Sequence, residues 1–320
     1  MCVHLFFTSF PAARRLPVLL LCLLPVASWS HGVVGKRFFP STLAIEDPFA
    51  NDELSLVGSH IREPGEGDKP STRATSLEAE YARTLTPNVA LSIGNEYLYA
   101  DPDTGKTRRG FGNLELGVKY QFYTHAATET VASASLGISL NHTGDTHLEA
   151  NDFTTLSPAI LFGQGFGALP DSAGLLRPLA ITGVLDFGFP SDSRSRKNGE
   201  AQRNPVTSGW GMALMYNLHY LQTSVRDVGL KAPFNRMVPI VEVAGETCLN
   251  RGCNGDTTAF INPGVIWIGK TFQLGAEAQI PINHRTGDST GVLLQLHLFL
   301  DDLFPRTIPM TTGHPGASPR

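Results

Sequence analysis

Outside its N-terminus the sequence has no run of 18 or more apolar residues, which argues against a helical membrane protein. Charged residues are scarce at 17%, below the roughly 25% of an average soluble domain. The formal net charge of -4 favours neither a nucleic-acid partner nor a strongly basic membrane-surface protein. Glycine and proline, by contrast, are frequent, with 32 and 22 residues, as expected of a chain with many turns.

Catalytic signatures are also missing. No G-x-S-x-G, H-E-x-x-H or Gly-rich phosphate loop occurs in a supporting context. A barrel lipase would need a serine, a histidine and an orienting polar group together, and the stretch 141–147 offers His and Asp without a suitable Ser. We therefore expect no enzyme activity and no cofactor.

The N-terminus has the pattern of a cleaved export signal over residues 1–30. Arg14 and Arg15 precede a short apolar core at 16–27, and small residues allow a cut after Ser30. Such a cut would leave His31 as the first residue, where its amine and imidazole could chelate Cu(II) together. No second histidine is close in sequence, so His31 is only a weak metal candidate and we otherwise predict no metal site.

Cysteine usage agrees with export. Cys2 and Cys22 fall in the signal, which leaves Cys248 and Cys253 as an even pair five residues apart. A lone pair in a secreted chain predicts a disulfide that closes a small loop. Two thiolates without a nearby histidine would make a poor metal site.

Apolar and polar residues alternate along many segments, which is typical of β-strands with one apolar and one polar face. In 271–282 the residues Phe272, Leu274, Ala276, Ala278, Ile280 and Ile282 share one parity, while the other is mainly polar. About twelve such segments are present, each close to the length that a tilted strand needs to cross a bilayer. They lie near 51–61, 74–84, 88–99, 111–123, 130–140, 154–163, 176–189, 209–221, 236–246, 257–268, 271–282 and 290–300.

The connections between these segments fall into two alternating classes. Counted from the first strand, the odd-numbered connections are polar and mostly long, whereas several even-numbered connections are tight turns. The even-numbered connections 163–174 and 222–235 are long exceptions, and 222–235 could form a helical turn under the barrel. Outer-membrane barrels have short periplasmic turns and longer outer loops. The fold class predicted is therefore all-β, an antiparallel transmembrane β-barrel of about 12 strands at 51–304, preceded by a periplasmic or plug-like segment at 31–50 and followed by a tail at 305–320.

Three stretches carry a resemblance to a known group. The stretches 31–56, 110–122 and 298–305 resemble Gram-negative outer-membrane β-barrel proteins grouped as candidate transporters of the phenol-degradation meta-pathway, FadL-like or porin-like in kind. The resemblance implies an outer-membrane location and passage of small hydrophobic or aromatic compounds. The last strand also loosely matches the pattern read by the barrel-assembly machinery, which we expect as a partner together with membrane lipid and a small-molecule solute.

The polar parity of the strands predicts the residues that line the lumen. The candidates are Glu96, Glu115, Lys119, Asp186, Glu242, Glu277, Gln273 and Gln279. They would either form a solute pathway or, because twelve strands enclose a narrow space, pair with one another and plug a structural barrel. The outward parity and the strand ends predict interfacial aromatic belts built from Tyr97, Tyr99, Tyr120, Phe122, Tyr123, Tyr216, Tyr220, Trp210 and Trp267.

Two functions remain open from the sequence. The preferred one is passive transport of small molecules across a bacterial outer membrane, through a polar wall that replaces part of the solute's hydration. In a FadL-like variant, an N-terminal segment would plug the route. The alternative is a non-transporting structural or surface-interaction barrel that acts through the loop at 190–208.

Overall fold

The computed structural model describes residues 32–65, 70–148, 150–197, 200–253 and 255–304. The predicted signal, His31 and the tail at 305–320 lie outside the described residues. No helix within the described part of the chain is both long enough and apolar enough to span a membrane.

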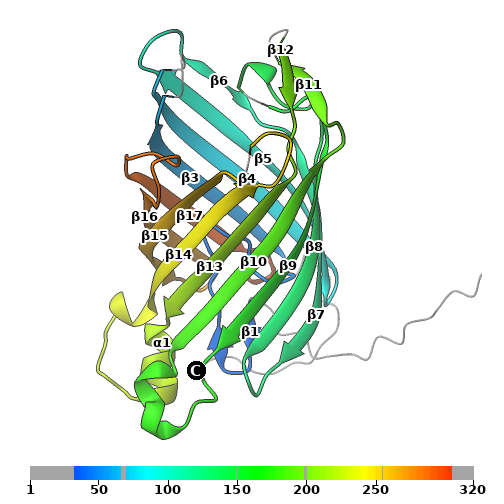
Figure 1. Cartoon of the computed structure of the whole chain (residues 1–320). Helices are drawn as coiled ribbons and strands as arrows, with labels where there is room; N and C mark the ends of the chain where they lie inside the picture. The colour runs from blue at the N-terminus through cyan, green and yellow to red at the C-terminus, as the bar shows by residue number, and fades with distance from the viewer. Residues whose placement is uncertain (1–31, 66–69, 149, 198–199, 254, 305–320) are drawn as a thin grey trace, which may run out of the picture.

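Within these residues, twelve antiparallel strands close into one barrel (Figure 1), which confirms the predicted fold class. The strands are β3 (Glu53–Glu63), β4 (Thr72–Thr86), β5 (Val89–Pro102), β7 (Glu115–His125), β8 (Thr130–Ser139), β9 (Thr155–Gly165), β10 (Leu179–Pro190), β13 (Thr207–Tyr216), β14 (Met237–Cys248), β15 (Thr257–Ile268), β16 (Phe272–Pro281) and β17 (Gly291–Phe299). Sequential neighbours pair throughout, and β17 pairs with β3 to close the ring. Closure leaves no unpaired sheet edge, which lipid could not satisfy.

Connections of two kinds separate the two ends of the barrel. At the loop end lie β6 (Arg108–Phe111), which extends the pairing of β5, the β11 (Arg194–Lys197) and β12 (Glu200–Arg203) hairpin, and η1 (Thr146–Leu148). At the short-turn end the long exceptions carry η2 (Asp171–Leu176), α1 (Leu218–Tyr220), η3 (Leu221–Val225) and η4 (Phe234–Arg236). The short helix α2 (Leu300–Leu303) follows β17. Figure 1 shows β6, β11 and β12 at one end and α1 at the other.

Side chains alternate across the barrel wall as the sequence pattern predicts. On β16, Leu274 is 46% exposed on the outside, whereas Gln273 and Glu277 face the bore and are 0% and 4% exposed. Five of the predicted belt aromatics are exposed large side chains: Tyr97, Tyr99, Tyr120, Phe122 and Tyr123. A barrel with an apolar outer skin and polar residues inside matches the solvation that lipid and a wet lumen each require.

Residues 32–52, here called the inner segment, run inside the barrel before β3 begins. The segment starts with a small hairpin of β1 (Val33–Val34) and β2 (Arg37–Phe38). Its apolar side chains form a core with inward residues of the surrounding strands; this core comprises Val34, Phe39, Leu43, Ile45, Phe49, Val131, Ala180, Ala213, Met215, Val238, Ile240, Ile266 and Leu293. Most of the strand residues of this core lie near the short turns, so the bore is packed at that end.

Candidate functional site

The apex of the inner segment is held by side chains of two strands. Both carboxylate oxygens of Glu242 on β14 accept backbone N–H groups, one from Leu43 and one from Ala44, each at 2.8 Å. Gln273 on β16 accepts from the backbone N–H of Ser41 at 3.2 Å and donates to the Ser41 carbonyl at 2.7 Å. These contacts satisfy backbone groups that would otherwise be buried without partners, and they fix the height of the segment in the bore.

A second anchor lies at the short-turn end, around the fully buried Arg37. Its Nε donates to Glu129 at 2.6 Å, and its remaining nitrogens donate to the carbonyls of Pro178, at 2.9 Å, and Arg177. The Tyr220 hydroxyl donates to the other Glu129 oxygen at 2.9 Å, and the guanidinium lies 4.2 Å from the centre of the Tyr220 ring. The ion pair is therefore fully hydrogen-bonded, which is the condition under which a buried pair is tolerated.

The placement of Tyr220 corrects one prediction. The alternating pattern extends the strand to 221 and puts Tyr220 in an outer aromatic belt, but β13 ends at Tyr216 and Tyr220 is 4% exposed. The cause is Asn217, whose side-chain oxygen accepts the backbone N–H of Tyr220 at 2.9 Å and caps a helical turn. That turn carries Tyr220 beneath the bore, where its hydroxyl reaches Glu129.

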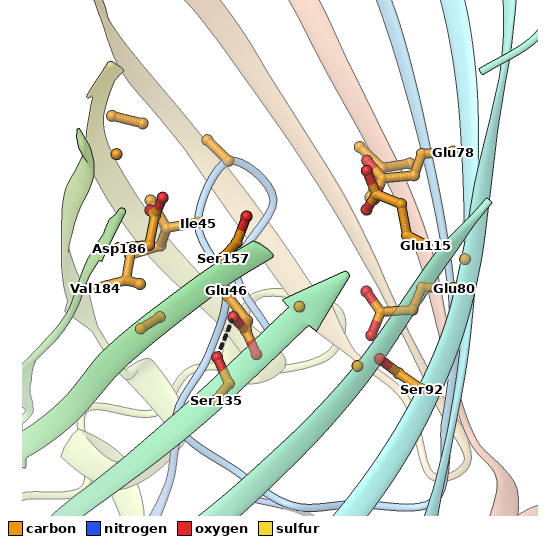
Figure 2. A pocket seen from close by; sticks show the side chains of 18 of the residues that line it. Ile45, Glu46, Glu78, Glu80, Ser92, Glu115, Ser135, Ser157, Val184 and Asp186 are labelled. Carbon is orange, nitrogen blue, oxygen red and sulfur yellow. Dashed lines mark hydrogen bonds between the residues drawn. The ribbon is translucent and has the colours of Figure 1, made fainter. Parts of the chain in front are cut away.

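Lys119 on β7 neutralises part of the inner segment's own charge. Its ammonium lies 3.0 Å from a Glu46 oxygen and 3.9 Å from an Asp47 oxygen, and it donates to the Asp47 carbonyl at 2.8 Å. Ser135 donates to Glu46 at 3.2 Å, a bond drawn in Figure 2. The lysine is consequently engaged with the segment and contributes little positive charge to the space above it.

Above the inner segment, on its loop-end side, lies a cavity of about 610 Å³. Leu43, Ala44, Ile45 and Glu46 form its floor, and inward residues of the strands form its wall. Within the described residues that line it, Lys119 is the only Lys, Arg or His side chain. The carboxylates are Glu46, Glu53, Glu78, Glu80, Glu115, Asp186 and Glu246. A low-dielectric wall with this balance of charge focuses a negative potential into the bore.

The acidic side chains are concentrated on neighbouring strands. Glu78 on β4 is directly across from Glu96 on β5, and Glu115 on β7 is paired with Gly94 of the same strand. Figure 2 shows Glu78, Glu80 and Glu115 on one side of the space and Asp186 on the other, with Glu46 between them. Like charges placed directly across a strand pair destabilise a sheet, so this arrangement opposes stability and points to a use in binding or passage.

The eight predicted lumen residues fall into three groups. Glu115, Lys119, Asp186 and Gln279 line the cavity. Glu242, Gln273 and Glu277 are buried beneath it, at 0%, 0% and 4% exposure. Glu96 lies beside the cavity lining, across from Glu78. Sequence parity alone does not distinguish the cavity wall from the buried contacts under the floor.

Several residues of the site were not selected from the sequence. Glu246 shares the inward parity of Glu242 and ends the expected strand at 236–246, so the same parity count could have included it. Glu46, Arg37 and Glu129 had no periodic signal, because the inner segment is irregular and Glu129 sits in a tight turn between β7 and β8. Their partners are up to 141 positions away in sequence for Arg37, and only barrel closure brings them together.

Cys248 and Cys253 form a disulfide at the loop end, with their Cα atoms 5.8 Å apart. Within the described residues, no group of three or more His, Cys, Asp or Glu side chains is placed to hold a metal ion. The weak copper candidate His31 stays a prediction, because it falls outside that part of the chain.

Comparisons with known proteins place the fold. The barrel shares its architecture with an outer-membrane channel. That crystal structure, from Pseudomonas putida F1, has 12% sequence identity and a TM-score of 0.56, and the match covers 82% of this chain and 99% of the other. The NanC porin matches with 8% identity and a TM-score of 0.47, over 77% of this chain and 98% of the porin. The KdgM porin matches with 8% identity and a TM-score of 0.43, over 76% of this chain and 98% of the porin. No family model and no curated protein matches the chain. The resemblance to candidate phenol-pathway transporters stays a prediction.

Proposed function

We propose that this protein is a channel of the bacterial outer membrane that passes small, polar, positively charged solutes. The observation that carries the proposal is the 610 Å³ cavity, whose lining holds seven carboxylates and one lysine inside a closed barrel with an apolar outer surface. The negative potential of such a bore concentrates cations and excludes anions. The carboxylates and the serine hydroxyls of the wall replace part of a solute's hydration shell.

The inner segment determines how a solute could pass from the cavity to the periplasm. It closes the short-turn end of the bore with a packed core, and its apex is the cavity floor. We propose that solutes enter from the loop end and reach the periplasm when the apex shifts away from Glu242 and Lys119. The apex is held by hydrogen bonds, by an ion pair and by the packing of Leu43 and Ile45, and it borders the cavity, whereas the base is fixed by the fully buried Arg37 anchor. Because water in the cavity can replace the polar contacts of the apex, the apex is the part suited to move.

This lining chemistry extends what the family resemblance implies. Leu43, Ile45 and Phe49 give the cavity apolar surface that could contact an aromatic ring, and the carboxylates of the wall add a preference for an amine or a metal cation over a neutral compound. Benzylamine and benzyl alcohol form a matched pair, since they share a ring and differ in charge. Liposomes that contain the protein should take up the amine faster than the alcohol, relative to protein-free liposomes; the opposite order would support the hydrophobic route.

Single-channel recording tests the proposal directly. In planar bilayers we expect stepwise conductance with a reversal potential that favours K⁺ over Cl⁻. A unit charge about 7 Å from the path contributes about 0.6 kcal/mol even at the dielectric constant of water. Salt screening reduces this value, so Glu78→Gln with Glu115→Gln should lower the permeability ratio by about twofold per carboxylate.

Asp227→Asn is the matched control, because Asp227 is at the short-turn end and is not part of the cavity lining. It should leave the ratio unchanged. Folded protein that stays silent at every voltage would instead favour the non-transporting barrel, and anion selectivity would contradict the assigned solute class.

A further inference from the structure

Two carboxylates are buried together just below the cavity floor. Glu242 on β14 and Glu277 on β16 are 0% and 4% exposed, and they flank β15 at Asn262 and Gly264, two residues apart on that strand. Within the described residues, no ion pair reaches either of them; Lys119 pairs with Glu46 and Asp47, and Arg37 pairs with Glu129. Burying two such groups side by side is unfavourable unless a cation or a shared proton compensates their charge.

The oxygens around this pair also lack partners. Neither Glu277 oxygen has a hydrogen-bond partner, and the same is true of the Asn262 side-chain oxygen, although Asn262 is 1% exposed. Asn262 on β15 is directly across from Glu242, so both side chains project from the same inner face. The pairs Ile261 with Ile280 and Gly264 with Glu277 put Gln279, whose side-chain oxygen is also unpartnered, across from Asn262.

This donor set has a definite chemical preference. Carboxylate and amide oxygens are the ligands of hard cations, and Ca²⁺ accepts irregular arrangements of six to eight oxygens more readily than Mg²⁺ does. Each Glu242 oxygen accepts one N–H from the inner segment, which leaves further lone pairs free for a cation. Asn262 and Gln279 also line the cavity, so an ion can reach the pair from the wet side.

We propose that Glu242, Glu277 and Asn262 bind a hard divalent cation of the Ca²⁺ class, with Gln279 at its cavity side. The ion would join β14, β15 and β16 and, through Glu242, hold the Leu43–Ala44 apex of the inner segment in place. The acidic cavity above supplies the ion by raising its local concentration. This site is independent of whether solutes cross the barrel.

Calcium binding to the refolded full-length barrel in detergent tests the site. Equilibrium dialysis with radioactive Ca²⁺ should show a saturable class of about one ion per barrel, and Ca²⁺ should raise the unfolding temperature relative to EDTA. Glu277→Gln should weaken this binding at least about tenfold and abolish the Ca²⁺-dependent rise, since removal of a carboxylate ligand reduces affinity sharply. In EDTA the same variant should unfold at a higher temperature than the wild type, because it no longer buries two like charges.

The matched control is Glu115→Gln, which removes the same charge from the cavity wall but not from the pair. It should change the binding by less than about twofold, consistent with a purely electrostatic contribution. Asn262→Ala provides a second test of the site if Glu277→Gln does not fold, as judged by the heat-modifiable gel shift. Absence of saturable Ca²⁺ binding, or equal losses in Glu277→Gln and Glu115→Gln, would overturn the proposal; a pair that shares a proton would give the first of these results.

Discussion

Replacement of Arg37 by alanine is expected to lower the free energy of unfolding by about 3–5 kcal/mol. The reason is that the guanidinium is the cationic partner of Glu129 and also serves the carbonyls of Arg177 and Pro178. Without it, the buried Glu129 carboxylate loses its counter-charge and the Arg177 carbonyl loses its donor, whereas the Pro178 carbonyl keeps the backbone N–H of Asn217. The Tyr220 hydroxyl would remain on Glu129 but cannot neutralise its charge.

Urea titration of the refolded barrel in detergent micelles, followed by Trp fluorescence and by gel mobility, measures this loss. Arg62→Ala is the matched control, because Arg62 pairs with Asp103 while the two side chains are 43% and 38% exposed. Exposed pairs contribute about 0–1 kcal/mol, so this control should be nearly neutral. If Arg37→Ala were as mild as Arg62→Ala, the inner segment would not be anchored at its base as the contacts indicate.

Exchange of both partners separates the charge from the packing. Glu129→Gln combined with Arg37→Ala removes the uncompensated carboxylate and should recover part of the loss, since an unpaired buried charge accounts for much of the cost. If the double variant is more stable than Arg37→Ala alone, the buried charge of Glu129, rather than the lost volume of the arginine side chain, is the main cause of the destabilisation.

The barrel could be predicted because the residue pattern that specifies each strand lies within about ten consecutive residues. On β16, the alternation of Gln273, Gly275, Glu277 and Gln279 with apolar neighbours is enough to assign a strand and its two faces. Even the weakest expected segments, near 51–61 and 154–163, correspond to β3 and β9. The lengths of the connections then distinguish the two ends of a barrel.

The interior could not be predicted in the same way, because its contacts are non-local. The bonds from Leu43 to Glu242 and between Ser41 and Gln273 join residues 199 and 232 positions apart. The sequence of the inner segment has no hydrophobic period of 2 or 3.6 residues, so its pattern does not predict where the segment lies. Small inward residues are the one available signal: a side chain at Gly275 would collide with Leu43, so this glycine leaves space for the segment.

The largest functional effect is expected from a covalent lock on the apex of the inner segment. Ile45 is buried against Gly211 of β13, and a Cβ built on this glycine would lie 3.5 Å from the Ile45 Cβ. Disulfides span Cβ distances of about 3.5–4.5 Å. The double variant Ile45→Cys with Gly211→Cys should therefore cross-link under oxidation without a large movement of either backbone.

If solutes pass when the apex shifts, the oxidised double variant should lose at least about tenfold of the open-channel conductance, because the bond removes the displaced state from the ensemble. Dithiothreitol should restore the steps within one recording. Wild-type protein with dithiothreitol controls for reduction of the native Cys248–Cys253 bond, and Ile45→Cys alone controls for the change in packing. A cross-link proved by mass spectrometry that leaves the conductance intact would show that ions pass beside a stationary segment, and the floor of the cavity would then be a fixed wall rather than a gate.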